Sequence, residues 1–84
     1  MFSNTNQGTF YCVGISFSVS NNMREMTDKV MQREERARLW EISKTYNLGT
    51  SGKHTRNKAE ALQWLDALPD SVRGLCSVIE FSPL

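Results

Sequence analysis

The chain has 84 residues, with 10 lysines and arginines, 9 aspartates and glutamates and a formal net charge of +1. This length fits one domain over residues 1–84, which would bury only about 60–65% of the surface that the unfolded chain exposes. The hydrophobic content of 39% excludes the composition of a disordered chain. The small net charge argues against bulk attraction to DNA or to an anionic membrane, although charges can still be organised locally.

The sequence indicates a cytoplasmic protein. It has no apolar stretch near the roughly 20 residues that a membrane-spanning helix needs, and its first residues do not have the pattern of a signal peptide. Cys12 and Cys76 are too few for a disulfide framework, so we expect two buried thiols, with a disulfide between them as the less favoured alternative. Together with the single histidine, His54, they are also too few for a zinc site. We expect no metal and no cofactor.

The first predicted element is a β-strand. Residues 1–8 are polar and are expected to be flexible, whereas residues 9–20 alternate between larger and smaller side chains, as a strand does. The larger side chains share one face: Tyr11, Val13, Ile15, Phe17 and Val19. The opposite face, with Gly14 and small polar groups, would either face solvent or accept the close approach of another element.

A long helix is predicted next, from residue 23 to about residue 46, a stretch without proline or glycine. Asn22 and Glu25 have the spacing of a capping box at its start. The apolar residues form two clusters on nearly opposite sides, one of Met23, Met26, Val30, Ala37 and Trp40, the other of Met31, Leu39, Ile42 and Tyr46. The helix therefore either breaks or bends near residues 37–39, or contacts other groups on both sides.

The second half of the chain predicts a loop, a helix and a strand. Residues 47–57 contain two glycines and are expected to be an exposed loop. Asn57 and Glu60 repeat the capping-box spacing, and a narrow apolar stripe then predicts a short amphipathic helix that ends before Pro69. After a turn, residues 75–81 are rich in β-branched and aromatic residues and predict a second strand.

These elements define an α+β fold in the order β-α-α-β, with a small antiparallel sheet of two to three strands packed against two helices. An isolated pair of strands is marginally stable. We therefore expect a third strand from a terminus, from the loop at residues 47–56 or from a second copy of the chain.

No set of residues predicts an enzyme. Residues 49–55 partly resemble the phosphate-binding pattern GxxxxGK[ST], but the first glycine of that pattern would fall at Asn47, and His54 follows Lys53 in place of serine or threonine. His54 beside Ser51 or Thr55 is not a catalytic arrangement, because such groups usually converge from separate elements. We expect no catalytic site.

The most specific feature is a row of cations around a tryptophan on the long helix. Lys29, Arg33, Arg36 and Lys44 fall within an arc of about 80° that also contains Trp40. We call this set the basic row; loop residues Lys53, Arg56 and Lys58 would extend it. Such a face can hold phosphates while the indole stacks on a base, or it can fit an acidic protein. The alternative is structural: the basic stems cover the core edge, and Trp40, like Trp64, fills the core.

The sequence favours a small non-catalytic protein-binding module, an inhibitor or regulator that occupies a partner's surface. Its size also fits the compact proteins that phages and mobile elements encode. The expected contact is an exposed apolar face at Leu39, Ile42 and Tyr46, which would bind another protein or a second copy in a homodimer. The alternative is a nucleic-acid-binding protein that uses the basic row and the loop at residues 53–58.

Overall fold

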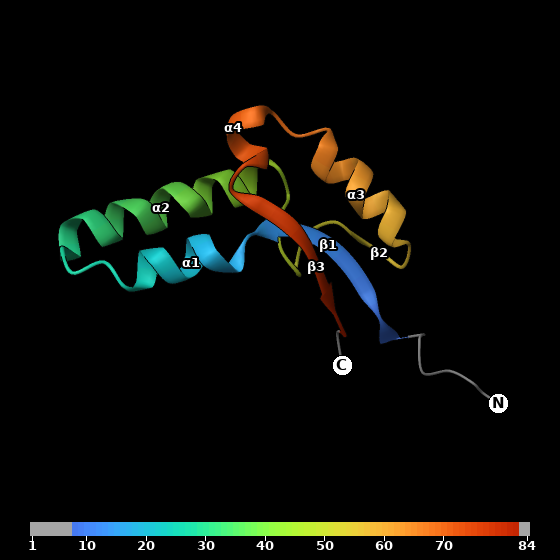
Figure 1. Ribbon diagram of the computed structural model, residues 1–84, viewed down its shortest axis with the longest axis horizontal. Helices are drawn as coiled ribbons and strands as arrows, with labels where there is room; N and C mark the ends of the chain where they lie inside the picture. Colours follow the sequence, from blue (N-terminus) through green and yellow to red (C-terminus); the bar gives the residue numbers. More distant parts are fainter. Residues whose placement is uncertain (1–7, 83–84) are drawn as a thin grey trace.

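The computed structural model describes residues 8–82, which form a three-stranded sheet, four helices and the connecting loops (Figure 1). In chain order the elements are β1 (Phe10–Ile15), α1 (Phe17–Arg24), α2 (Lys29–Thr45), β2 (His54–Thr55), α3 (Lys58–Asp66), α4 (Asp70–Arg73) and β3 (Cys76–Phe81). The predicted α+β class is confirmed, and the loop at residues 47–56 supplies the third strand. Apart from Gly8, the segment expected to be flexible lies outside the described residues.

β1 is the central strand and is antiparallel to both neighbours. It pairs with β3 along its whole length, from Phe10 opposite Phe81 to Ile15 opposite Cys76. The short β2 pairs with the other edge of β1, where His54 lies opposite Cys12. α3 lies against all three strands. The sheet and α3 together therefore form the centre of the molecule.

The core is small and is drawn from segments far apart in the sequence. Its buried apolar residues are Cys12, Val13, Leu39, Leu48, Ala61 and Val72. They come from β1, the second half of α2, the loop after α2, α3 and α4. α1 contributes no buried residue, and α2 contributes Leu39. We call α1 and α2 together the arm, because Figure 1 shows them as a helical hairpin that extends away from the sheet.

Polar contacts organise the turn of the arm. The Asp28 carboxylate accepts hydrogen bonds from the amides of Val30 and Met31 at 3.0 and 3.1 Å and so caps α2. From the first turn of α2, the side chain of Gln32 donates to the carbonyl groups of Met23 and Arg24 at 3.1 and 3.0 Å. These bonds satisfy backbone groups that the two helix ends leave free.

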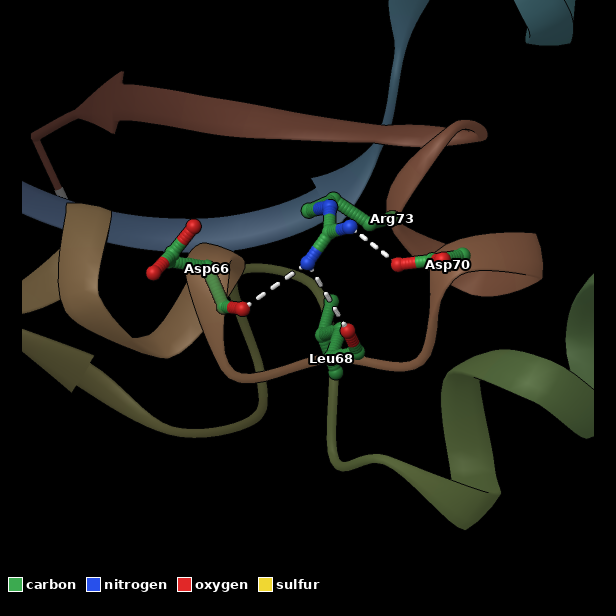
Figure 2. Close-up of polar contacts among 4 residues, drawn as sticks. All are labelled: Asp66, Leu68, Asp70 and Arg73. Carbon is green, nitrogen blue, oxygen red and sulfur yellow. Dashed lines mark hydrogen bonds and ion pairs between the residues drawn. The ribbon is translucent and has the colours of Figure 1, made fainter.

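Arg73 ties the end of α3 to α4, as Figure 2 shows. Its Nη1 donates to the carbonyl oxygen of Asp66 at 2.9 Å and to that of Leu68 at 3.3 Å, and its Nη2 pairs with the carboxylate of Asp70. A guanidinium at this position satisfies carbonyl groups that a helix C-terminus leaves without partners. The turn expected at Asp70 is thus a short helix whose position is set by Arg73.

The predicted strand at residues 9–20 is wrong in its second half, which forms α1. The pairing with β3 ends at Ile15, and the amide of Ser16 donates to the carbonyl oxygen of Leu75 at 2.8 Å. β3 begins one residue after Leu75, so no further ladder partner is available to the chain beyond Ser16. A helix satisfies the following backbone groups internally, which a strand without a partner does not.

The single helix predicted from residue 23 to residue 46 is also wrong. Asn22 lies inside α1 instead of capping a helix, and the helices are separated before Lys29 instead of near residues 37–39. Asp28 supplies the stronger start signal because its carboxylate accepts from the first free amides of α2. Of the first apolar cluster, Met23 belongs to α1 and Met26 to the turn, whereas Val30, Ala37 and Trp40 lie on the exposed side of α2. Leu39 and Ile42 of the second cluster lie on the inward side of α2.

The elements predicted for the second half of the chain are confirmed with small changes. Asn57 caps α3 by accepting from the amide of Ala59 at 2.9 Å, and α3 ends at Asp66. The second hydrogen bond of the predicted capping box differs, because the Asn57 amide donates to the side chain of Thr55 and not to that of Glu60. The Thr55 hydroxyl accepts from the Asn57 amide at 3.0 Å and donates to the Glu60 carboxylate at 2.5 Å. β3 forms as expected at Cys76–Phe81.

Strand register explains why the cysteines are free. Cys12 lies opposite Ile79, whereas Cys76 lies opposite Ile15. Residues 12 and 15 of one strand point to opposite faces of the sheet, so the two thiols do as well. The alternative of a disulfide between them is therefore wrong. Burial raises the pKa of both thiols.

Both thiols should react slowly with the disulfide reagent DTNB in the native protein near pH 8, with Cys12 slower than Cys76. Cys12 is fully buried and Cys76 is half-buried, and the raised pKa lowers the thiolate fraction that attacks the reagent. The rates should continue to rise at a pH where an ordinary thiol is already ionised. Reaction traces of Cys12→Ala and Cys76→Ala, with denatured protein as the control, test this. Equal native and denatured rates would contradict the burial.

Candidate functional site

The basic row lies on the exposed side of α2. Lys29, Arg33, Arg36, Trp40 and Lys44 are all exposed. Trp40 itself retains 59% of its surface. The side of α2 that faces inward instead carries Leu39, which is buried, with Glu35 and Ile42, which are half-buried. The structural alternative in which Trp40 fills the core is therefore wrong.

The cations of the basic row are separated from the acidic groups of α2. Glu34 and Glu41 project outside the arc of the row, because consecutive helical residues diverge by about 100°. Glu35 pairs with Arg38 at 2.7 Å, and the hydrogen bond from Arg38 holds the pKa of Glu35 below its usual value. Within residues 8–82 the other ion pair joins Asp70 and Arg73. The charge of the basic row is thus not neutralised by an ion pair in the described part of the chain.

A cleft opens at the C-terminal end of the basic row. The Lys44 ammonium lies 4.1 Å from the centroid of the Trp40 ring, a cation–π contact. The cleft has a volume of about 250 Å³, and its walls are Trp40, Ser43, Lys44, Asn47, Leu48, Ser51 and Gly52. It therefore combines an aromatic ring, a cation and several hydroxyl and amide groups.

A second cleft, which also contains a tryptophan and a lysine but is otherwise more apolar, lies between the sheet, α3 and the loop. The Lys53 ammonium lies 4.4 Å from the centroid of the Trp64 ring. This cleft has a volume of about 190 Å³ and is lined by Val13, Tyr46, Asn47, Leu48, Lys53, Trp64, Ala67 and Leu68. Trp64 is half-buried, so it contributes both to packing and to an accessible wall.

The two clefts share a wall, the loop that follows α2. Asn47 and Leu48 line both of them. The loop is anchored because the Gly49 amide donates to the Val13 carbonyl oxygen at 2.9 Å and the Lys53 amide donates to the Asn47 carbonyl oxygen at 3.2 Å. Leu48, a residue of this loop, is buried, so the prediction of an exposed loop over residues 47–57 is wrong at this position. One hydrogen bond to β1 and one within the loop therefore hold in place the segment that separates the clefts.

Other loop residues predicted to extend the basic row lie in different surroundings. Arg56 stacks over the Phe10 ring at 5.1 Å and lines a separate cleft with Tyr11 and Glu80 at the end of the sheet. Lys58 is the first residue of α3 and is exposed. Of the three predicted loop cations, Lys53 alone lines one of the two tryptophan clefts.

Two features of the site were not predicted from the sequence. One is the pairing of Lys53 with Trp64, which are eleven positions apart and meet through the fold. The other is an aromatic cluster on the sheet, in which the rings of Phe10 and His54 lie 5.1 Å apart and those of His54 and Phe81 lie 6.0 Å apart. Phe10 lies within the strand predicted from residue 9, but no sequence pattern indicates that His54, in a predicted loop, pairs with β1 beside it.

The exposed apolar contact expected at Leu39, Ile42 and Tyr46 is wrong for Leu39. Leu39 is only 6% exposed, because this part of α2 packs against the core. Ile42 is half-buried, and Tyr46 lines the Trp64 cleft. Tyr46 is 37% exposed, as predicted, and the other exposed large apolar residues on the arm are Phe17, Val30, Met31 and Trp40.

The described residues show no metal site and no membrane-spanning helix, and comparison with known proteins finds no relative. Residues 8–82 hold no group of three or more histidine, cysteine, aspartate or glutamate side chains placed to bind a metal ion. No helix in this part of the chain combines the length and apolarity that crossing a bilayer requires. No protein-family model, curated protein or solved structure matches the chain.

The two tryptophans should differ in solvent access. In Trp64→Phe the remaining Trp40 should emit at longer wavelength and be quenched more strongly by acrylamide than Trp64 in Trp40→Phe, because Trp40 is exposed and Trp64 is half-buried. Trp40→Ala should change the free energy of unfolding by about 0.5 kcal/mol or less, and Trp64→Ala should lower it by about 1–3 kcal/mol. Equal quenching, or a larger loss for Trp40→Ala, would show that Trp40 is part of the core.

Gly52→Ala should destabilise the loop between the clefts. A methyl group at Gly52 would overlap the backbone carbonyl group of Asn47, which cannot rotate away as a side-chain end can. We expect a loss of about 1–3 kcal/mol in the free energy of unfolding, measured by chemical denaturation. Gly74→Ala is the matched control, because Gly74 has φ −64° and the nearest heavy atom would lie 3.7 Å from the added methyl. Equal effects of the two substitutions would contradict this account of the loop.

Proposed function

We propose that the protein is a non-catalytic nucleic-acid-binding module that uses the basic row of α2. The observation that carries this proposal is the exposure of Trp40, at 59%, among cations that form no ion pair within residues 8–82. Lysine and arginine neutralise phosphates, and an exposed indole offers a stacking surface for a base. An indole intended only for packing would gain more free energy in the core.

The spacing of the basic row suits a chain of phosphates. From residue 29 to residue 44 a helix rises about 22 Å, at about 1.5 Å per residue. The cations are thus distributed along one side of an elongated arm instead of being gathered at one point. The net charge of +1 is compatible with this face, because the acidic groups of α2 project elsewhere.

A second candidate function is the protein-binding module favoured by the sequence. It is supported by Phe17, Val30 and Met31, which leave 73%, 61% and 53% of their surfaces exposed on the arm. Exposed apolar groups on a projecting helix are typical of a contact with another protein. In this case the protein would act as an inhibitor or regulator by occupying a partner's surface, or would form a homodimer through the arm. For either function we propose a cytoplasmic location, in which Cys12 and Cys76 stay reduced.

Binding of fluorescent single-stranded and duplex oligonucleotides across a salt series tests the first candidate. The logarithm of the affinity should fall linearly with the logarithm of the salt concentration. Arg33→Ala/Arg36→Ala should weaken binding and reduce the slope by about 1.5, since each phosphate contact contributes about 0.7–0.9. Arg24→Ala/Arg38→Ala removes the same charge at positions outside the basic row and should retain most of the wild-type slope.

Two results would contradict nucleic-acid binding: no binding of either oligonucleotide at low salt, or equal losses in the two double variants. The second candidate would gain support if, in addition, a protein partner or a self-associated state persisted at high salt and was lost in Val30→Glu/Met31→Glu. Analytical ultracentrifugation of the same variant separates a homodimer from a complex with another protein.

A further inference from the structure

The two tryptophan clefts repeat one combination of groups on either side of a single loop. Each contains an indole ring with a lysine ammonium over it, at 4.1 Å for Trp40 and 4.4 Å for Trp64. Each also shares the wall formed by Asn47 and Leu48. One aromatic group and one cation in each cleft would match a ligand that repeats a planar ring and a negative charge.

We infer that these clefts bind two bases of one single-stranded nucleic acid, with the strand crossing the loop between them. This inference rests on the proposed nucleic-acid binding and adds the class of nucleic acid and the mode of contact. Lys44 and Lys53 lie over the indole rings in the free protein. On binding, each ammonium would move to a neighbouring phosphate and leave its ring as the stacking surface for a base. An acidic peptide offers the charge without a repeated aromatic face, so it matches the clefts less well.

The size of the clefts favours a base over a larger ligand. Their volumes are about 250 Å³ and 190 Å³, below the roughly 300–1,000 Å³ typical of pockets that enclose a whole small molecule. A base in a duplex is stacked and paired on its neighbours, whereas a base in a single strand can enter a side cleft. The geometry therefore favours a single strand over a duplex.

The loop between the clefts is suited to a crossing strand. Residues 49–52 are Gly-Thr-Ser-Gly, and no heavy atom beyond its chain neighbours lies within 4 Å of the Cβ position at Gly49, so a sugar–phosphate backbone can approach closely there. The hydrogen bonds from Gly49 to Val13 and from Lys53 to Asn47 fix the loop before any ligand binds. Preorganisation of this kind reduces the entropy that binding has to overcome. The glycine-rich segment thus would contribute to nucleic-acid binding without being a nucleotide-binding motif.

Titration with a short oligodeoxythymidylate, followed by tryptophan fluorescence, tests the two-cleft arrangement. Trp40→Phe and Trp64→Phe each leave a single reporter, and we expect quenching of both. Trp40→Ala should weaken binding of the single strand roughly 10-fold, for the loss of one stacked base. Lys53→Ala should also weaken binding and should reduce the salt slope by about 0.7, for the loss of one phosphate contact. Lys53→Ala probes the second cleft without removing the half-buried Trp64 ring. Phe17→Ala, which removes an exposed aromatic group outside both clefts, is the control and should bind as the wild type does.

A duplex containing the same thymidylate strand completes the experiment and separates two kinds of failure. Tighter binding of the single strand, with quenching of both tryptophans, is the expected result. Equal binding of the two forms, sensitive to Arg33→Ala/Arg36→Ala but with either tryptophan unquenched, would overturn the two-cleft inference and leave the proposed function intact. No binding of either form would overturn both.

Discussion

The pairing of β1 with β3 is the constraint on which the rest of the structure depends. Its register places Ile15 opposite Cys76, so the ladder ends where the chain leaves β1. The next residues form a helix, and α1 and α2 are directed away from the sheet as the arm. The same register sends Cys12 and Cys76 to opposite faces. One six-residue pairing thus determines both the position of the arm and the state of the thiols.

The edge of β1 that faces away from β3 then organises the candidate site. The loop after α2 bonds to this edge through Gly49, and β2 continues the contact through residues 54–55. The loop connects α2 to β2 and α3. Trp40 of α2 and Trp64 of α3 therefore line two different clefts, and Asn47 and Leu48 of the loop line both. Trp40 and Trp64 become comparable sites because a loop anchored to the central strand lies between them.

The sequence predicts the features that depend on local patterns and not those that depend on packing. β3 follows from its content of β-branched and aromatic residues, and the Asn57 cap and the shared face of the basic row follow from spacing. The alternation of apolar and polar side chains over residues 17–20 is compatible with a strand and with a helix. These residues form a helix because no strand is available to pair with them. Leu39 and Trp40 are adjacent apolar residues, and which of them faces the core depends on how the arm leaves the sheet. The spacing of apolar residues along the helix does not show which of the two faces the core.

The exposure of Trp40 carries most weight because the core is small. With few large groups buried, a domain of this size would gain about 25 cal/mol for each Å² of indole that it removed from water. Trp40 instead remains largely exposed, next to Lys44 and in line with cations that lack ion pairs within the described residues. A partner that stacks on the Trp40 ring and neutralises the cations of the basic row would bury the indole and pair these charges. Single-stranded nucleic acid offers these two contacts in the same repeating unit, which is why this surface supports it over an apolar protein partner.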